Sequence, residues 1–182
     1  MESTKTRILK KLLETDGYLS GQELCEQLGV SRTAVWKYMK QLKEEGYEIE
    51  AVQNKGYCLK DVPDVLGESE IKSRLHTRWA GQTLYYYDEI DSTNTQIKRL
   101  AEEDAPHGTL AVADYQSRGK GRRGRAWDSP HGSAIYMSIL FRPEIRPDRA
   151  SMLTLVIGLS VTQAIRSNLG LQAQIKWPND VV

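Results

Sequence analysis

The sequence is short of several features that would by themselves assign a protein to a class. Its 182 residues include only two cysteines, three histidines and one phenylalanine. Cys25 and Cys58 lie far apart, so neither a disulfide framework nor a metal site is indicated. No segment approaches the roughly 18 apolar residues that span a membrane, and the polar N-terminus lacks the apolar core of a signal peptide. These absences favour a protein of the reducing cytoplasm without membrane contact.

The chain also lacks an excess of charge of either sign. Its formal net charge is +1, with 25 basic and 24 acidic residues. Any contact with nucleic acid or nucleotide must therefore come from a local basic patch. The stretch Asp-Val-Pro-Asp at 61–64 interrupts the alternation of helical and strand patterns, because proline disfavours a helix. We therefore predict a linker over 61–67. We expect one small domain over 1–60 and a second domain over 68–182.

The first 60 residues begin with a pattern typical of three short helices. Apolar residues at helical spacing predict a first helix over 4–15. Ser20 and Glu23 form a capping-box pair at the start of a second helix, which Gly29 ends. Ser31 is a typical N-cap for a third helix. Two short helices joined by the tight Gly-Val-Ser turn at 29–31 indicate a helix-turn-helix.

A β-hairpin is predicted directly after the third helix, which Gly46 ends. The segments 47–52 and 57–60 have the residue pattern of strands, and Asn-Lys-Gly at 54–56 is a typical hairpin turn. Three helices followed by a hairpin make a winged helix-turn-helix domain.

The third helix carries the physical case for DNA binding, because its N-terminal side chains would reach base edges in the major groove. Arg32 can donate to a guanine edge, and Lys37 and Lys40 can meet phosphates. The alternative is a solvated helix face or a protein-interaction surface. The candidate DNA-contacting residues are Ser31, Arg32, Thr33, Trp36, Lys37, Lys40 and, at the hairpin tip, Lys55.

From residue 68 onward, helical and strand patterns alternate, which predicts an α/β domain built around a sheet. The expected strands lie over 84–90, 109–114, 134–141 and 174–177. The expected helices lie over 68–75, 91–103 and 148–169. Ligands of such domains usually bind in the loops at the strand ends.

A glycine- and arginine-rich loop is the most unusual segment of this second domain. Five of the eight residues at 118–125 are cations, and none is an acid. Alternating glycines let the backbone approach a ligand closely, and guanidinium groups suit phosphate and carboxylate oxygens. The loop matches neither a Walker loop nor a dinucleotide fingerprint. On charge alone, a basic tether for RNA or DNA is a serious alternative.

Two further motifs accompany this loop. Asp-Ser-Thr-Asn at 91–94 has groups that can read a small polar ligand, although simple helix capping is the plainer interpretation. Lys-Trp-Pro-Asn-Asp at 176–180 puts a lysine at the end of a strand expected to be buried, where it needs an anionic partner, followed by a turn at 178–179. An exposed lysine before a turn is the alternative there.

Together the three motifs resemble those of biotin–protein ligases in order and rough spacing. The shared segments are 91–94, the Gly-Lys-Gly-Arg-Arg-Gly-Arg run at 119–125 with Trp127, and 176–180. With the winged helix in front, the chain resembles the bifunctional form that also represses biotin genes. The resemblance implies a class II-synthetase-like mixed α/β catalytic domain, ATP-dependent formation of biotinyl-5′-AMP with Mg²⁺, and biotin transfer to a lysine of a carboxylase's acceptor domain. It also implies operator DNA as a partner and dimerisation when the adenylate is bound.

The resemblance also implies roles for individual residues, including a catalytic role for Lys176 and Arg122. The residues expected to bind biotin are Ser92, Thr93, Asn94, Gln116, Lys120, Gly121, Arg122 and Lys176. Those expected near ATP or the adenylate are Arg122, Arg123, Arg125 and Trp127, and no residue is assigned to a metal. No side-chain nucleophile is required, because the biotin carboxylate itself attacks the nucleotide.

Two departures from the family pattern bear on this interpretation. The loop has Gly-Lys-Gly at 119–121 where the family often has Gly-Arg-Gly, and lysine keeps the charge but loses the bidentate fork. The sequence stops at Val182, whereas family members continue, so we expect a C-terminally truncated ligase. The alternatives are a biotin-sensing repressor without catalysis, a fragment that retains only DNA binding, and a basic-loop nucleic-acid-binding protein.

Overall fold

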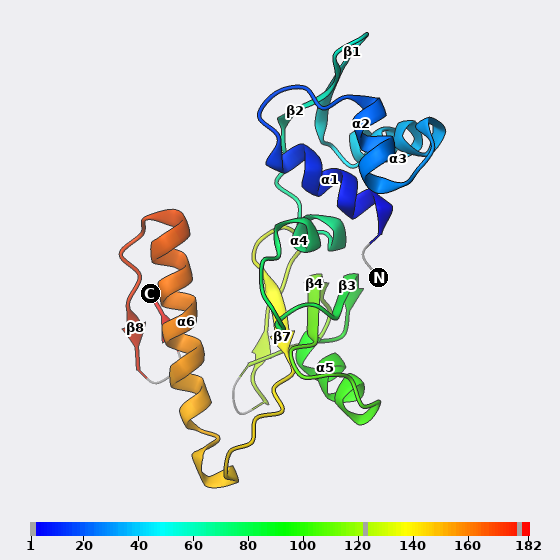
Figure 1. Cartoon of the computed structure of the whole chain (residues 1–182). Coiled ribbons are helices and arrows are strands. Elements are labelled where there is room, and N and C mark those ends of the chain that lie inside the picture. The colour runs from blue at the N-terminus through cyan, green and yellow to red at the C-terminus, as the bar shows by residue number, and fades with distance from the viewer. Residues whose placement is uncertain (1–2, 122–123, 178–179) are drawn as a thin grey trace. The chain divides into compact units, whose positions relative to one another are not determined.

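A computed structural model describes residues 3–121, 124–177 and 180–182 of the chain. Contacts between residues divide the chain into two compact units, Met1–Phe141 and Arg142–Val182. The first unit contains a helical domain with a hairpin, followed by a small sheet (Figure 1). The second unit contains a long helix and a short hairpin.

Residues 3–61 form the predicted winged helix-turn-helix. Its elements are the helices α1 (Thr4–Glu14), α2 (Gly21–Leu28) and α3 (Arg32–Glu44), and the antiparallel strands β1 (Glu48–Val52) and β2 (Gly56–Asp61). Figure 1 shows the three helices packed together, with the β1–β2 hairpin extending beyond them as the wing. The fold class predicted for this domain is confirmed.

Side-chain caps explain where these short helices begin and end. The Ser20 hydroxyl accepts from the Glu23 amide at 3.0 Å, and the Ser31 hydroxyl accepts from the Ala34 amide at 3.2 Å. Gly29 ends α2 in the left-handed conformation, with φ +67°. The helices then bury one apolar face each in a common core. Its most completely buried members are Ile8, Leu9, Leu24, Val35 and Leu42.

Helix α4 (Glu68–Arg74) packs against α1 and also contacts the first strand of the sheet. Tyr47, which precedes β1, is buried, and its hydroxyl donates to Glu70 Oε2 at 2.6 Å. Burial and this bond to a carboxylate raise the pKa of Tyr47. α4 is thus tied to the winged helix, although the sequence pattern assigns it to the second domain. The domain boundary at 61–67 stays a prediction.

A three-stranded mixed sheet follows, in the order β3–β4–β7. The strands β3 (Leu84–Ile90) and β4 (Leu110–Gln116) are parallel, and β7 (Tyr136–Ile139) lies antiparallel to β4. The third strand is shorter than the predicted 134–141, because only its four central residues pair with β4.

Helix α5 (Thr93–Glu102) connects β3 to β4, as parallel strands require. Its buried side chains pack on the sheet through a small core of Ile97, Leu100, Ala105 and Ala111. This crossover places the first turn of α5 beside the ends of both parallel strands.

The second unit consists of the 3₁₀ turn η2 (Pro147–Arg149), helix α6 (Met152–Leu169) and the two-residue strands β8 (Ile175–Lys176) and β9 (Asp180–Val181). The prediction of one helix over 148–169 is wrong at its start. The proline and an Arg146–Asp148 ion pair of 3.1 Å form a separate turn there. Gly170 ends α6 in the left-handed conformation, as predicted. Within the described residues, no helix is long and apolar enough to cross a membrane.

Candidate functional site

The parallel pairing of β3 and β4 brings the 91–94 motif beside Gln116, the residue in which β4 ends before the glycine- and arginine-rich segment. Ile90 ends β3 in register with Gln116, which ends β4. The 91–94 motif therefore begins directly beside Gln116, although Gln116 lies 22 positions after Asn94 in the chain. Ligands of open α/β sheets commonly bind at this carboxyl edge of the strands.

Gln116 joins this motif to the rest of the site through a directed chain of hydrogen bonds. Its Oε1 accepts from the backbone amide of Thr93 at 2.8 Å and from the Thr93 hydroxyl at 3.1 Å. Its Nε2 donates to Ser129 Oγ at 3.0 Å. The Ser138 hydroxyl donates to Thr93 Oγ1 at 3.0 Å. Thr93 and Gln116 are thus held in fixed orientations at the centre of the site.

Ser129 and Ser138 are site residues that the sequence interpretation missed. Ser129 is almost fully buried and also donates to the Trp127 carbonyl at 3.3 Å, whereas Ser138 lies on β7. Neither belongs to one of the three motifs. The only available signal was that Ser129 lies two residues beyond Trp127, which already belonged to the resemblance.

The Ser92 hydroxyl is the exceptional group of the site. The residue is 1% exposed and stands at the N-cap position of α5, yet its side chain makes no cap hydrogen bond. Within the described part of the chain, Ser92 Oγ is the buried side-chain oxygen that has no hydrogen-bond partner. Simple helix capping is therefore wrong for this residue. A buried hydroxyl without a partner is costly, and a ligand group at this position would satisfy it.

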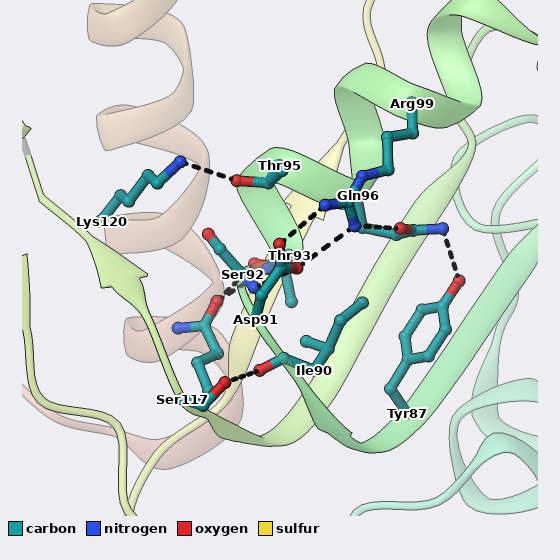
Figure 2. A network of polar contacts seen from close by, with 11 residues as sticks. Tyr87, Ile90, Asp91, Ser92, Thr93, Thr95, Gln96, Arg99, Ser117 and Lys120 are labelled. Atoms are coloured by element: carbon teal, nitrogen blue, oxygen red, sulfur yellow. Dashed lines mark hydrogen bonds and ion pairs between the residues drawn. The ribbon is translucent and has the colours of Figure 1, made fainter.

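Charged side chains surround this polar centre, and Figure 2 shows how they are arranged. Arg99 Nη2 lies 2.8 Å from Asp91 Oδ2, and the Ser92 amide donates to Asp91 Oδ1 at 2.7 Å. Arg99 first, and then the Ser92 amide, hold the pKa of Asp91 below its usual value. Lys120 Nζ donates to Thr95 Oγ1 at 3.1 Å, which brings a cation from the glycine-rich segment over the first turn of α5.

The described residues of the glycine- and arginine-rich segment include a short strand that pairs antiparallel with the residues following the segment. β5 (Gly119–Lys120) pairs with β6 (Ala126–Trp127), and the Gly121 amide donates to the Arg125 carbonyl at 2.8 Å. Gly119 is buried against β6. A Cβ there would overlap the Trp127 carbonyl oxygen and would lie 2.7 Å from Ser129 Oγ. Only glycine fits where the two strands cross. Gly119 therefore lies close to Ser129, the residue that accepts from Gln116.

The roles of the other residues predicted to bind the ligand stay predictions, and the described ones among them lie at the surface. Arg125 and Asn94 are exposed, and Trp127 is 62% exposed, although it lies against Gly121. The predicted roles of Arg122 and Arg123 lie outside the described residues.

Lys176 belongs to the second unit, where it lies on the two-residue strand β8 and pairs with Asp180. Its side chain is exposed within this unit, and the ligand-binding role predicted for Lys176 stays a prediction. β8 pairs only with β9 among the described residues. The predicted turn at 178–179 lies outside the described residues.

The candidate DNA-contacting side chains of α3 lie on its outer face. Ser31, Arg32, Thr33 and Lys37 are exposed, and Trp36 is 60% exposed. Lys40 Nζ lies 5.9 Å from the centre of the Trp36 ring and 3.7 Å from Glu44 Oε1. A large aromatic side chain that stays exposed among cations is expected of a binding surface.

The wing is fixed to the body of the domain close to its tip, at the second residue of β2. The Leu19 and Tyr57 backbones exchange two hydrogen bonds of 2.8 and 2.9 Å. Lys55 at the wing tip lies with its Nζ 5.5 Å from the centre of the Tyr18 ring. The Tyr18 hydroxyl donates to Glu50 Oε2 at 2.7 Å. Lys55, which is predicted to contact a phosphate, is thus carried by a wing that is hydrogen-bonded to the body of the domain.

Comparison with known proteins shows which family the chain belongs to. Residues 4–58 match the family model described as "HTH domain", and residues 86–182 match "Biotin/lipoate A/B protein ligase family". The second match covers more than half of the chain. The chain therefore belongs to the biotin/lipoate A/B protein ligase family, with a helix-turn-helix domain in front.

Curated relatives extend the similarity over the whole chain. The bifunctional ligase/repressor BirA of Bacillus spizizenii is 46% identical over 100% of this chain and 57% of its own length. The protein of the same name from Salmonella typhimurium is 35% identical over 99% of this chain and 55% of its own length. The chain spans about half the length of these relatives. A solved biotin protein ligase of Aquifex aeolicus, in complex with biotin and ATP, is 39% identical over 55% of this chain and 41% of its own, with a TM-score of 0.48.

Proposed function

We propose that the protein containing this chain activates biotin with ATP, transfers it to a lysine of a biotin-acceptor domain, and represses biotin genes through its winged helix. The observation that carries the ligase part is the polar site at the ends of β3 and β4. There a buried Ser92 hydroxyl without a partner lies beside the cationic β5–β6 hairpin. Membership of the ligase family and the similarity to bifunctional ligase/repressor proteins support the same reaction.

The chemistry explains why the site needs cations and requires no side-chain nucleophile. In the first step, the biotin carboxylate attacks the α-phosphorus of ATP, forming biotinyl-5′-AMP and releasing pyrophosphate. In the second, the acceptor lysine attacks the biotinyl carbonyl and AMP leaves. Both reactants of the first step are anions, so cations must offset their repulsion and the charge that develops at phosphorus. Mg²⁺ would enter with the nucleotide.

Residues of the described site have distinct tasks in this proposal. Ser92 donates to or accepts from a polar group of biotin. The hydrogen-bonded Thr93–Gln116 pair lines the site beside Ser92, and the exposed Asn94 lies at the edge of the site. Lys120 and Gly121 cover the carboxylate and phosphate, and Arg125 and Trp127 lie toward the adenylate. Lys176 is assigned to the biotinyl carboxyl and phosphate, and Arg122 and Arg123 to the phosphates.

The winged helix supplies the second activity of this proposal. α3 would enter the major groove, Lys55 would meet a phosphate beside it, and an adenylate-bound dimer would place two such helices on paired half-sites. The cytoplasm would be the compartment of both activities, and both cysteines are free thiols, as a reducing compartment would keep them.

Pyrophosphate release by the full-length protein tests the ligase proposal. With biotin and ATP together, release should be seen at a rate well above that with either compound alone. A protein that binds biotin with the same affinity in the presence and absence of ATP, and releases no pyrophosphate, would be a biotin sensor without catalysis.

Replacing Ser92 with alanine separates stability from binding. Because the Ser92 hydroxyl has no partner, its removal should leave the free energy of unfolding unchanged or raise it by up to about 1 kcal/mol. Biotin affinity should fall about tenfold, since a buried ligand group then loses its hydrogen bond. Thermal unfolding and calorimetric titration with biotin measure the two effects. Loss of stability together with unchanged biotin affinity would contradict the assignment of Ser92.

A further inference from the structure

Gln22, near the start of α2, forms a hydrogen-bonded chain with two charged residues. Its Oε1 accepts from Arg32 Nη2 at 2.8 Å, and its Nε2 donates to Glu26 Oε1 at 2.6 Å. Arg32 is the first residue of α3, whereas Glu26 lies one turn along α2. The amide of Gln22 therefore links the two helices of the helix-turn-helix at their exposed ends.

The chemistry of the three groups gives the Gln22 amide a single favourable orientation. A carboxylate only accepts hydrogen bonds and a guanidinium only donates them. Glu26 must therefore face the amide nitrogen, which turns the amide oxygen toward Arg32. One side chain with both a donor and an acceptor fits between these partners, and glutamine has this property.

The Gln22–Arg32 pair lies at the N-terminal end of α3, the end of a recognition helix that reaches base edges. It lines a cavity of about 460 Å³ that is bounded on its other side by the wing residues 51–57. A guanidinium has five N–H donors, and the bond to Gln22 occupies one of them. Arg32 thus retains donors for the O6 and N7 acceptors of a guanine, which is the commonest specific contact of arginine in the major groove.

We propose that Gln22 is a positioning residue for Arg32 and so sets how strongly the protein discriminates one guanine of its operator. The proposal rests on the proposed binding of DNA by the winged helix. A free arginine on the surface samples many rotamers, and ordering it on binding lowers affinity. Gln22 holds the guanidinium in place before the DNA arrives, so its benefit appears at the one base pair that Arg32 reads.

The test uses full-length protein with biotin and ATP, and a duplex selected by the wild-type protein from a random pool. Affinities are measured for this duplex and for versions in which each guanine is replaced in turn. The guanine whose replacement no longer matters in Arg32→Ala defines the contact of Arg32. In Gln22→Ala, discrimination at this guanine should fall three- to tenfold, whereas discrimination at other positions and the unfolding temperature should stay as in the wild type.

α2 offers a matched control for this substitution. Gln27 is exposed and donates to Glu23 Oε1 at 2.9 Å, one turn apart, with no bond to Arg32. Gln27→Ala should therefore leave discrimination unchanged. The exchanged double variant Gln22→Glu/Glu26→Gln keeps the net charge and an acceptor for Arg32, so it should restore discrimination to within about twofold of the wild type.

Each remaining outcome contradicts the proposal in an identifiable way. Equal weakening of all duplexes by Gln22→Ala would make Gln22 a sequence-independent phosphate contact. Unchanged discrimination in Gln22→Ala, or no guanine assigned to Arg32, would also overturn the positioning role while leaving operator binding intact. If the wild-type protein selects no sequence from the pool, the DNA-binding proposal itself fails, and this inference fails with it.

Discussion

Replacing Gly119 with alanine should abolish most of the ligase activity of the full-length protein. The new Cβ would overlap the Trp127 carbonyl oxygen and would lie 2.7 Å from Ser129 Oγ, so β5 and β6 must separate. Ser129 accepts from Gln116, and the displacement would therefore spread to the centre of the polar site. A misplacement of about 1 Å can lower turnover on the order of 100-fold. Pyrophosphate release measures this loss.

The expected loss of stability in Gly119→Ala is smaller than the loss of activity. The hairpin has two residues in each strand and lies away from the winged-helix core, so the cost should be about 1–3 kcal/mol. Gly124→Asn is the control in the same hairpin, because Gly124 has φ +75°, which asparagine tolerates, and open space around its Cβ position. This control should retain ligase activity within about twofold. Equal activities of Gly119→Ala and the wild type would show that the hairpin does not shape the site.

Replacing Gly56 with alanine should weaken DNA binding and leave ligase turnover intact. Gly56 has φ +110°, and a Cβ there would overlap the Leu19 carbonyl oxygen and lie 2.7 Å from the Leu19 carbonyl carbon. The backbone bonds between Leu19 and Tyr57 would break, and the wing would lose its anchor. We expect about 2–4 kcal/mol of destabilisation of the winged helix, from backbone strain and overlap together. Operator affinity should fall at least about tenfold, because Lys55 is carried by the displaced wing.

Gly17 provides the matched control for this prediction. Its φ of +106° is nearly the same, but no atom lies within 4 Å of its Cβ position. Gly17→Ala should therefore cost only the backbone strain, about 1–2 kcal/mol, and leave operator affinity nearly unchanged. Thermal unfolding and a DNA titration on both variants separate strain from overlap. Equal effects of the two substitutions on DNA affinity would contradict the anchored wing.

Local sequence patterns were sufficient to predict most helices and strands of the first unit. Capping at Ser20 and Ser31 and the left-handed glycine at position 29 involve residues within a few positions of one another. Such short-range chemistry can be read from a single sequence. The start of α6 was mispredicted, because a proline turn followed by a helix has nearly the same apolar pattern as one longer helix.

The sequence by itself also determined the family, since three motifs in the right order resemble those of biotin–protein ligases, and the match to the biotin/lipoate A/B protein ligase family confirms this membership. It could not determine how those motifs are joined. The bonds of Gln116 to Thr93 and Ser129 depend on the parallel register of β3 and β4 and on the β5–β6 hairpin. Only the tertiary structure decided which hydroxyls are satisfied there and left Ser92 without a partner. Hydrogen bonds between distant segments depend on distances of a few tenths of an ångström, which no local pattern encodes.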